Sequence, residues 1–539
     1  MATPAPGRKT LLKGGLIVDG TGAPPRPGSV LLDGQRIDAL GEVPGCAGES
    51  IDCTGKVIAP GFIDAHSHMD FFSASDDPHH FDSFTAQGVT TFVAGNCGFS
   101  PFGFAPRTRH RRLLESSLFK AGRDTLDWNS FSEYRAIVGE IGLTHNFVHL
   151  VGHGAVRTSL AGFDARPLTR SEHTQMLELL DRALNEGAAG VSLGLQYKPG
   201  VFAKLDELDE VARLVKRHDK VLTVHAKAYS SLSGTYPMLP FGRAHNLKAI
   251  DDMLGLARRT GVRLQFSHLI FVGSQTWKTV DEAIELFDRA ISDGVDVCFD
   301  MFPYACGATL LNTLLPEWFM ARMPGVLHNR LARGRLRLEA EVGFRLVGFG
   351  YPQIQITNAS CAEYDEHNGR FLPEIAARVG KSNFDTMLDI LDKSKAQARV
   401  LFHDYYNDGI IDRLMRHPAA IFASDSWPEP GGHQNPAAYG TFPRFLRWAR
   451  DRKNISLEDA VHKMTGAAAT RFRLQKRGHL EEGHAADVVV FDWSAVRDHT
   501  DESGDAPPSG IERVFVNGES IFEAGRVSLA RGAGKVLLS

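Results

Sequence analysis

Eight short apolar runs alternate with amphipathic segments along the middle of this 539-residue chain. The amphipathic segments, such as 171–185, 205–218 and 279–292, carry apolar residues near helical spacing. Strands that alternate with helices are typical of α/β proteins, and eight such units predict a (β/α)8 TIM-like barrel. The predicted strands are 57–64, 89–95, 147–152, 187–195, 221–225, 264–268, 295–302 and 421–425.

Both ends of the chain have a different, β-rich pattern. Short apolar runs divided by Gly and Pro turns occupy residues 11–40, and similar runs recur between 487 and 522. We expect one small β-sandwich domain built from both termini; two unrelated terminal β pieces are the alternative. The predicted domains are the sandwich, 1–60 and 475–539, and the barrel, 61–474 with an insertion at about 310–365.

The insertion is predicted from a stretch where the helical pattern becomes irregular. The basic segment 330–337 is followed by the Gly-rich segment 347–351. A long irregular segment beside a barrel is typical of a mobile lid over the active site. A peripheral helical decoration explains the pattern equally well, and the sequence leaves both open.

Composition narrows the class of protein. A hydrophobic content of 43% and a charged content of 23% are those of an ordinary globular protein. The net charge of −4 gives no support to nucleic-acid or anionic-membrane binding. No run reaches the roughly 20 apolar residues of a membrane span, and no secretory signal is readable. We expect a cytoplasmic protein with a small-molecule partner, and a homo-oligomer remains open.

Potential metal ligands stand at the ends of five predicted strands. His66 and His68 point the same way because side chains alternate along a strand. The carboxyl ends of barrel strands meet at one face, so the ligands should converge there. Imidazole, thiolate and carboxylate together suit a transition metal, whereas each alone is more often a satisfied polar group. The candidate ligands are His66, His68, Cys97, His225, His268 and Asp425.

Several motifs make the chain resemble the amidohydrolase superfamily, in its N-acyl-D-amino-acid deacylase (D-aminoacylase) branch. They include Gly61-Phe-Ile-Asp-Ala-His-Ser-His68, Gly95-Asn-Cys-Gly-Phe-Ser100, Gly194-Leu-Gln-Tyr-Lys-Pro-Gly200 and Tyr439-Gly-Thr-Phe-Pro-Arg444. The resemblance implies that Cys97, His225 and His268 hold one tightly bound zinc. It also implies a second, looser position at His66, His68 and Asp425, whose occupancy stays open.

The resemblance also implies a mechanism and a set of substrate contacts. Asp425 is expected to be general base and acid: it takes a proton from the attacking water and passes it to the departing amide nitrogen. The expected substrate-binding residues are Tyr197, Ile270, Phe302, Tyr304, Ala308 and His153. His153 and Arg157 are candidates to orient metal ligands, with a purely structural role as the alternative.

The chain departs from the family where relatives hold a substrate carboxylate. The matching positions are the apolar Ile270, Phe302, Ala308 and Ala437. A carboxylate buried against them would cost several kcal/mol, so we predict a neutral or apolar amide substrate. Lys227 and Arg444 are the alternative sources of positive charge.

Other functions remain as alternatives. A hydantoinase-like cyclic amidase usually has a metal-bridging lysine on strand 4, and Lys198 is predicted to be a loop or surface lysine instead. A true N-acyl-D-amino-acid deacylase also stays open. A deaminase would place a glutamate soon after His225, and residues 226–230 contain none. A non-enzymatic scaffold should have lost metal ligands, and all six are present.

Overall fold

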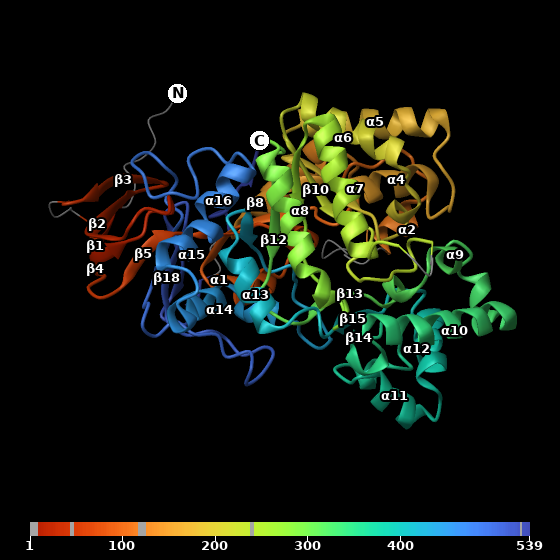
Figure 1. Ribbon diagram of the computed structural model, residues 1–539. Helices are drawn as coiled ribbons and strands as arrows, with labels where there is room; N and C mark the ends of the chain where they lie inside the picture. Colours follow the sequence, from red (N-terminus) through yellow and green to blue (C-terminus); the bar gives the residue numbers. More distant parts are fainter. Residues whose placement is uncertain (1–8, 44–47, 117–124, 238–241, 529–530) are drawn as a thin grey trace.

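A computed structural model describes residues 9–43, 48–116, 125–237, 242–528 and 531–539 (Figure 1). Eight parallel strands lie side by side in chain order and form a nearly closed barrel, so the predicted fold class is confirmed. These strands are β6 (Phe62–Asp64), β7 (Val89–Ala94), β8 (Asn146–Gly152), β9 (Gly190–Gly194), β10 (Val221–His225), β11 (Arg263–Phe266), β12 (Val297–Met301) and β16 (Ala420–Phe422).

The first and last barrel strands meet just beyond their carboxyl ends. The backbone N–H of Asp425 donates to the carbonyl of His66 at 2.9 Å. One residue further along each chain segment, a parallel β-bridge joins Ser67 to Ser426. This junction closes the barrel at the face where the candidate ligands lie.

Amphipathic helices surround the barrel, as the spacing predicts. In α6, for example, Leu208, Val211 and Val215 are buried while the opposite face is exposed. The helix α5 starts at a capping box between Thr169 and Glu172. The helices outside the insertion are α1 (Asp82–Thr85), α2 (Arg111–Glu115), α3 (Phe131–Ile141), α4 (His153–Ala161), α5 (Arg170–Asn185), α6 (Leu205–Arg217), α7 (His245–Thr260), α8 (Val280–Ser292), α13 (Asp408–Arg416), α14 (Ala437–Arg452), α15 (Leu457–Met464) and α16 (Gly466–Arg471).

Strands from both ends of the chain share one nine-stranded sheet, at the left of Figure 1. The two ends join where β5 pairs antiparallel with β17. Leu12 and Ile58 from the N-terminal strands pack with Val488 and Phe515 from the C-terminal strands in one apolar cluster. The strands are β1 (Lys9–Ile17), β2 (Arg26–Asp33), β3 (Arg36–Gly41), β4 (Glu49–Asp52), β5 (Val57–Pro60), β17 (Val488–Phe491), β18 (Ile511–Val516), β19 (Glu519–Glu523) and β20 (Arg526–Val527).

The predicted strand 57–64 is wrong as a single element. It divides at Gly61, so that β5 joins the terminal sheet and β6 joins the barrel. Gly61 donates its N–H to Asp487 at 2.9 Å, and a Cβ there would come within 2.2 Å of Thr90. The domain limits at about 60 and 475 remain a proposal, because β21 (Val536–Leu537) returns to pair with β8.

The expected insertion lies between β12 and β16, on the lower right of Figure 1. It contains a three-stranded sheet in the order β13-β15-β14. Because β15 spans Arg399–Phe402, the added elements extend past the expected limit at residue 365. The sheet escaped sequence reasoning because its strands lie far apart in the chain. The elements are β13 (Gly307–Leu310), α9 (Glu317–Met320), α10 (Arg330–Val347), β14 (Ile354–Asn358), α11 (Leu372–Val379), α12 (Asn383–Lys393) and β15 (Arg399–Phe402).

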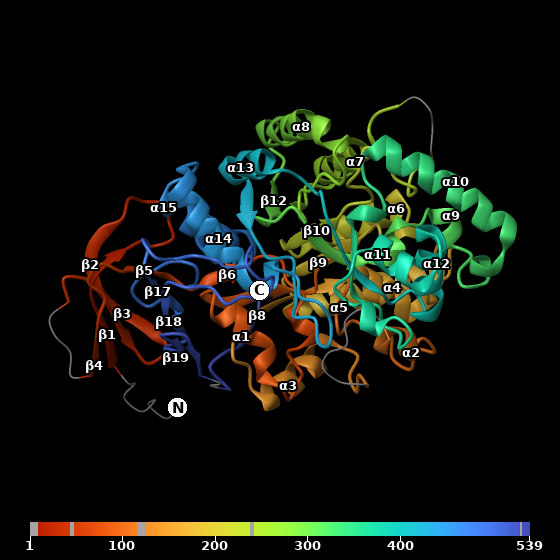
Figure 2. The same ribbon diagram turned by 90° about the horizontal axis from the view of Figure 1, so that it is seen from below.

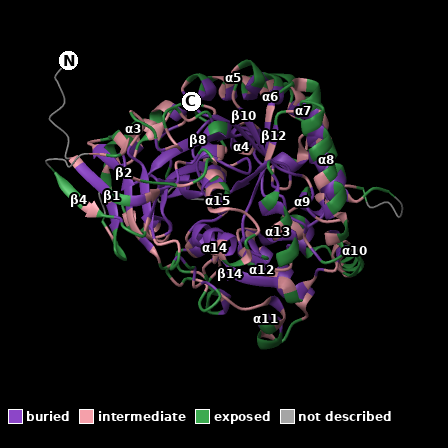
Figure 3. Cartoon of the chain, turned by 60° about the vertical axis from the view of Figure 1, so that its left-hand side comes forward, coloured by how far each residue is buried: buried purple, intermediate pink, exposed green. Residues whose placement is uncertain are grey.

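Burial follows this layering. In Figure 3 the barrel strands are buried and the outer faces of the surrounding helices are exposed. Within the described residues, no helix combines the length and the apolar character that crossing a membrane would require.

Candidate metal centre

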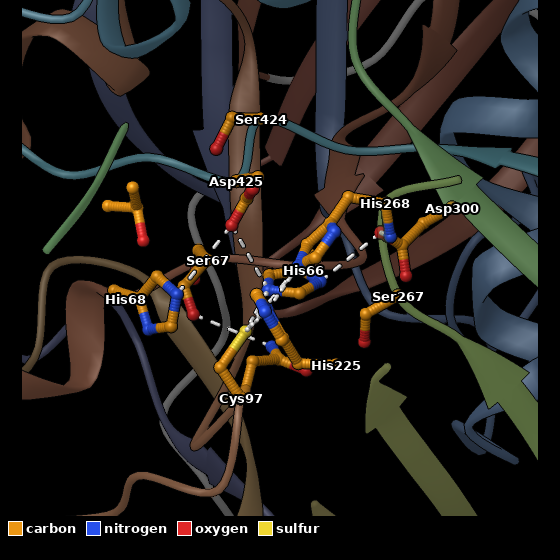
Figure 4. Close-up of polar contacts among 12 residues, drawn as sticks. His66, Ser67, His68, Cys97, His225, Ser267, His268, Asp300, Ser424 and Asp425 are labelled. Atoms are coloured by element: carbon orange, nitrogen blue, oxygen red, sulfur yellow. Dashed lines mark hydrogen bonds and ion pairs between the residues drawn. The ribbon is translucent and has the colours of Figure 1, made fainter. Parts of the chain in front are cut away.

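The six candidate ligands converge at the carboxyl end of the barrel (Figure 4). They form two groups whose donor atoms lie within 4.8 Å of one another, and the Cys97 thiol belongs to both. One group adds His225 and His268; the other adds His66, His68 and Asp425. Each group therefore holds the three or four donors that a divalent ion needs.

The distances within each group suit a small ion between the side chains. Cys97 Sγ lies 3.6 Å from His225 Nδ1 and 3.7 Å from His268 Nε2. The two ring nitrogens are 2.9 Å apart. In the second group, Asp425 Oδ1 lies 3.2 Å from His66 Nε2 and 3.6 Å from His68 Nε2.

The backbone has an unusual, left-handed conformation at three of the candidate ligands. Cys97, His268 and Asp425 have φ values of 55°, 31° and 49°, in the left-handed region that non-glycine residues rarely adopt. Each residue follows the end of a barrel strand, where a left-handed turn changes the direction of the chain. Strained conformations of this kind gather at functional sites, where the surrounding structure enforces them.

Two polar side chains, the buried Asp300 and the half-buried Gln196, contact the ligands from behind. Asp300 Oδ1 lies 3.2 Å from His66 Nδ1 and accepts the backbone N–H of His268 at 2.6 Å. Gln196 Oε1 lies 3.0 Å from His225 Nε2. Such contacts fix which ring nitrogen faces the ion. The contacts therefore turn Nε2 of His66 and Nδ1 of His225 toward the site.

The electrostatics of the pocket favour binding a cation. Burial raises the pKa of the Cys97 thiol to about 11, so forming the thiolate needs a nearby positive charge. Burial lowers the pKa of His68 to about 4, which leaves its ring neutral and able to coordinate. Burial also raises the pKa of Asp425, but the charges of His268 and His66 outweigh this and lower it, so Asp425 is a carboxylate. The donor set fits zinc, which accepts sulfur, nitrogen and oxygen ligands.

A cavity opens beside the ligands and is mostly apolar. His68, His225, His268 and Asp425 form its floor. Tyr197, Ile270 and Ala308 line it, and α10 contributes further apolar side chains. Among the described residues that line this cavity, none is a lysine or an arginine.

The amidohydrolase family model matches residues 49–307 and 349–522, which is most of the chain. The chain belongs to the amidohydrolase family. This amidohydrolase is a metal-dependent hydrolase of carbon–nitrogen amide bonds. Residues 308–348, which include α10, lie outside the match.

Curated relatives agree over nearly the whole chain. The N-acyl-D-aspartate deacylase of Alcaligenes xylosoxydans xylosoxydans is 30% identical, and the match covers 98% of this chain and 94% of the relative. The D-aminoacylase of the same organism is 29% identical and covers 98% and 97%. The resemblance to the D-aminoacylase branch is therefore confirmed.

Solved structures place the amidohydrolase in the same branch. A crystal structure of D-aminoacylase has a TM-score of 0.80 at 30% identity and covers 98% of this chain and 99% of its own. The N-acyl-D-glutamate deacylase of Bordetella bronchiseptica, in complex with zinc and a phosphonate inhibitor, has a TM-score of 0.81 at 29% identity, with the same coverage. A dihydropyrimidinase from Brevibacillus agri, at 14% identity and a TM-score of 0.58, shares only the fold.

Three of the expected substrate-binding residues lie outside the cavity wall. Phe302 packs against the rings of Tyr405 and Tyr406, with centroids 6.4 and 6.1 Å away. Tyr304 lies 3.0 Å from Thr500 through its hydroxyl, under the guanidinium of Arg444. Both residues follow the end of strand β12, and the motif match could not show which way each side chain turns.

His153 is also turned away from the cavity, into a buried ion cluster. Its Nε2 lies 2.8 Å from Glu207 Oε1, and Arg157 donates to the same carboxylate at 2.6 Å. Burial raises the pKa of Glu207, but the hydrogen bond from His153 and the charge of Arg157 outweigh this and lower it to about 2. The structural alternative for His153 and Arg157 therefore has the better support.

The alternative sources of positive charge are also engaged elsewhere. Lys227 lies 3.3 Å from Glu317, and Arg444 lies 2.8 Å from Asp498. Neither lines the cavity, and Ala437 is buried at the start of α14. Lys198 does not line this cavity; it lines an adjoining one that shares Phe99 and Tyr197 with it, and burial lowers its pKa to about 8.

Sequence reasoning missed the groups behind the ligands. Asp300 lies inside the apolar run 295–302, and Gln196 follows strand β9. A carboxylate inside an otherwise apolar strand was the available signal, because buried charge is costly unless it is paired. The wall residues Tyr229 and Trp427 gave no comparable signal, since large aromatic residues occur throughout the core.

Proposed function

We propose that this amidohydrolase is a zinc-dependent hydrolase of a neutral or apolar amide. The observation that carries the proposal is the cavity wall beside the ligands, where no described residue is a lysine or an arginine. Ile270 and Ala308 line the wall, at two of the positions where relatives hold a carboxylate. A substrate carboxylate there would be desolvated without a cation, at a cost of several kcal/mol.

We assign the ligand groups as the resemblance implies. Cys97, His225 and His268 hold the tighter zinc, and His66, His68 and Asp425 form a looser second position. When bound, zinc lowers the pKa of a water molecule and polarises a carbonyl group. Another structure of D-aminoacylase is described as having a binuclear metal centre with one-metal activation and second-metal attenuation, which supports two unequal positions.

We assign the proton transfer to Asp425. Its carboxylate lies on the cavity floor, beside the ligands and open to a substrate. It takes a proton from the attacking water and delivers it to the amide nitrogen, which leaves only after protonation. Tyr197 stands over His225, with ring centroids 4.6 Å apart, and forms the wall on that side.

Two other substrates remain as alternatives. The names of the relatives favour a true N-acyl-D-amino-acid deacylase. A cyclic amide or hydantoin is a second alternative, but the described residues that line the cavity beside the ligands include no lysine to bridge two metal ions. The cation-free wall distinguishes our proposal from the first alternative.

The test is a matched pair of substrates, one charged and one neutral. We expect kcat/KM for an N-acyl-D-amino acid amide to exceed that for the free acid by at least about 100-fold, since several kcal/mol correspond to that ratio. The zinc-loaded enzyme would be compared with a chelated sample and with one re-supplied with zinc. A large preference for the free acid would refute the proposal.

A further inference from the structure

Helix α10 carries an exposed apolar stripe. Among the described residues seven large apolar side chains are exposed, and four of them lie on this one helix. At 3.6 residues per turn these four fall within an arc of about 80°. They are Leu331 at 88%, Leu338 at 67%, Val342 at 43% and Leu346 at 59% exposure. Scattered exposed leucines are normal, but a stripe of this kind marks an interaction surface.

The opposite face of α10 covers the metal cavity. The side chains that line that cavity from α10 include Leu336, Ala340, Phe344 and Val347. Figure 2 shows α10 at the outer edge of the molecule, beyond the barrel helices. One helix thus separates an apolar cavity from an apolar stripe on the surface.

The charges beside the stripe are mainly positive. The helix contains five arginines and two glutamates. Arg330, Arg335, Arg337 and Arg345 are exposed, and Arg335 pairs with Glu339 at 2.7 Å. Apolar side chains flanked by arginine are typical of a helix that lies in the interface of an anionic bilayer. The net charge of the whole chain, −4, gave no sign of membrane binding because it sums over all residues and does not show a local positive patch.

A second copy of this chain is a less suitable partner for the stripe on α10 than an anionic lipid surface. In a twofold contact the same patch faces itself, so the arginines of one α10 would approach those of the other. Like charges across an interface cost free energy, whereas anionic headgroups complement them. The charge pattern therefore favours lipid.

We propose that α10 docks on an anionic lipid surface and that the cavity beneath it takes the acyl chain of an amide drawn from that surface. The second half of this inference rests on the proposed function. The substrate class is an uncharged amide with a long acyl chain, which partitions into lipid. The apolar, cation-free wall around Ile270 and Phe344 suits such a chain.

Sedimentation with vesicles tests the docking. The full-length, zinc-loaded protein would be mixed with vesicles of phosphatidylcholine alone or with added phosphatidylglycerol. We expect at least about tenfold tighter binding to the anionic vesicles, weakened by salt. The double variant Leu338→Ser/Leu346→Ser should lose at least tenfold in binding. Leu205→Ser is the matched control, because Leu205 is 49% exposed but lies on α6.

Activity measurements separate this inference from the proposed function. The Leu338→Ser/Leu346→Ser variant should hydrolyse a short, water-soluble amide normally and lose activity only on a long-chain amide in vesicles. The docking would be overturned if the unchanged protein hydrolysed the short amide but did not bind the anionic vesicles, or if it were a dimer that the double variant dissociates. Vesicle binding without hydrolysis of any amide would refute the proposed function and the substrate half of this inference.

Discussion

The carboxylate of Asp300 offers a sharp test of how the metal site is supported. Besides its contacts with His66 and the backbone of His268, it accepts a hydrogen bond from Gln265 Nε2 at 3.1 Å. An asparagine at this position keeps the shape. Its new amide group can donate to Gln265 Oε1, which lacks a partner, once the Gln265 amide turns over. Asp300→Asn therefore removes a charge and little else.

The magnitude follows from that loss of charge. A carboxylate behind a ligating imidazole raises its basicity, and removing such a partner typically costs about 10–100-fold in metal affinity, or about 1.4–2.8 kcal/mol. In the proposed assignment, His66 belongs to the looser of the two ligand groups. We expect the weaker zinc position to lose more affinity than the stronger one, and the fold to be retained.

Competition with a chromophoric zinc chelator measures both affinities. Asp288→Asn is the matched control, because Asp288 also pairs with a histidine, at 3.0 Å from His417 Nε2, but its side chain is 60% exposed. That control should bind zinc like the unchanged protein. Zinc affinities within twofold of each other for Asp300→Asn and the unchanged protein would refute the role assigned to this carboxylate.

Three further predictions concern proton transfer, charge and stability. Asp425→Asn should lose at least about 10³-fold in kcat while metal analysis still finds zinc, since base catalysis supplies roughly 10²–10⁴-fold. Ile270→Lys puts a cation on the cavity wall and should shift kcat/KM toward free N-acyl-D-amino acids; an unchanged ratio would contradict the cavity assignment. With its pKa lowered from 4.5 to about 2, Glu207 stabilises the fold above pH 4.5 and loses this effect as the pH falls toward 2. Glu207→Gln should therefore lower the thermal midpoint at pH 7 and flatten its acid dependence; equal midpoints at pH 7 would argue against the cluster.

The barrel was predictable because its strands and helices carry distinct periodicities. The boundary at Gly61 was not, since an apolar run does not reveal which of two sheets receives each half. The small sheet of the insertion was likewise hidden, because its three strands are separated by helices. Local pattern predicts an element well and its distant partner poorly.

At the site, the convergence of the six candidate ligands was predictable, and the contacts around them were not. Strand ends of a barrel meet in space, so residues such as Cys97 and Asp425 are brought together by the fold itself. The directions of the side chains of Phe302 and Tyr304 depend on packing after the strand has ended. The apolar run around Asp300 indicated a buried, paired carboxylate, but its contacts with His66 and the backbone of His268 could not be read from the sequence.

The junction between the first and last barrel strands has a consequence for assembly. His66 and Asp425 face one ion position, yet more than 350 residues of chain separate them. A growing polypeptide leaves the ribosome with its two histidines long before the matching carboxylate has been made. An ion at this second position can contact all of its candidate ligands only after the last barrel strand has joined the first, and it would then link the two ends of the barrel sheet.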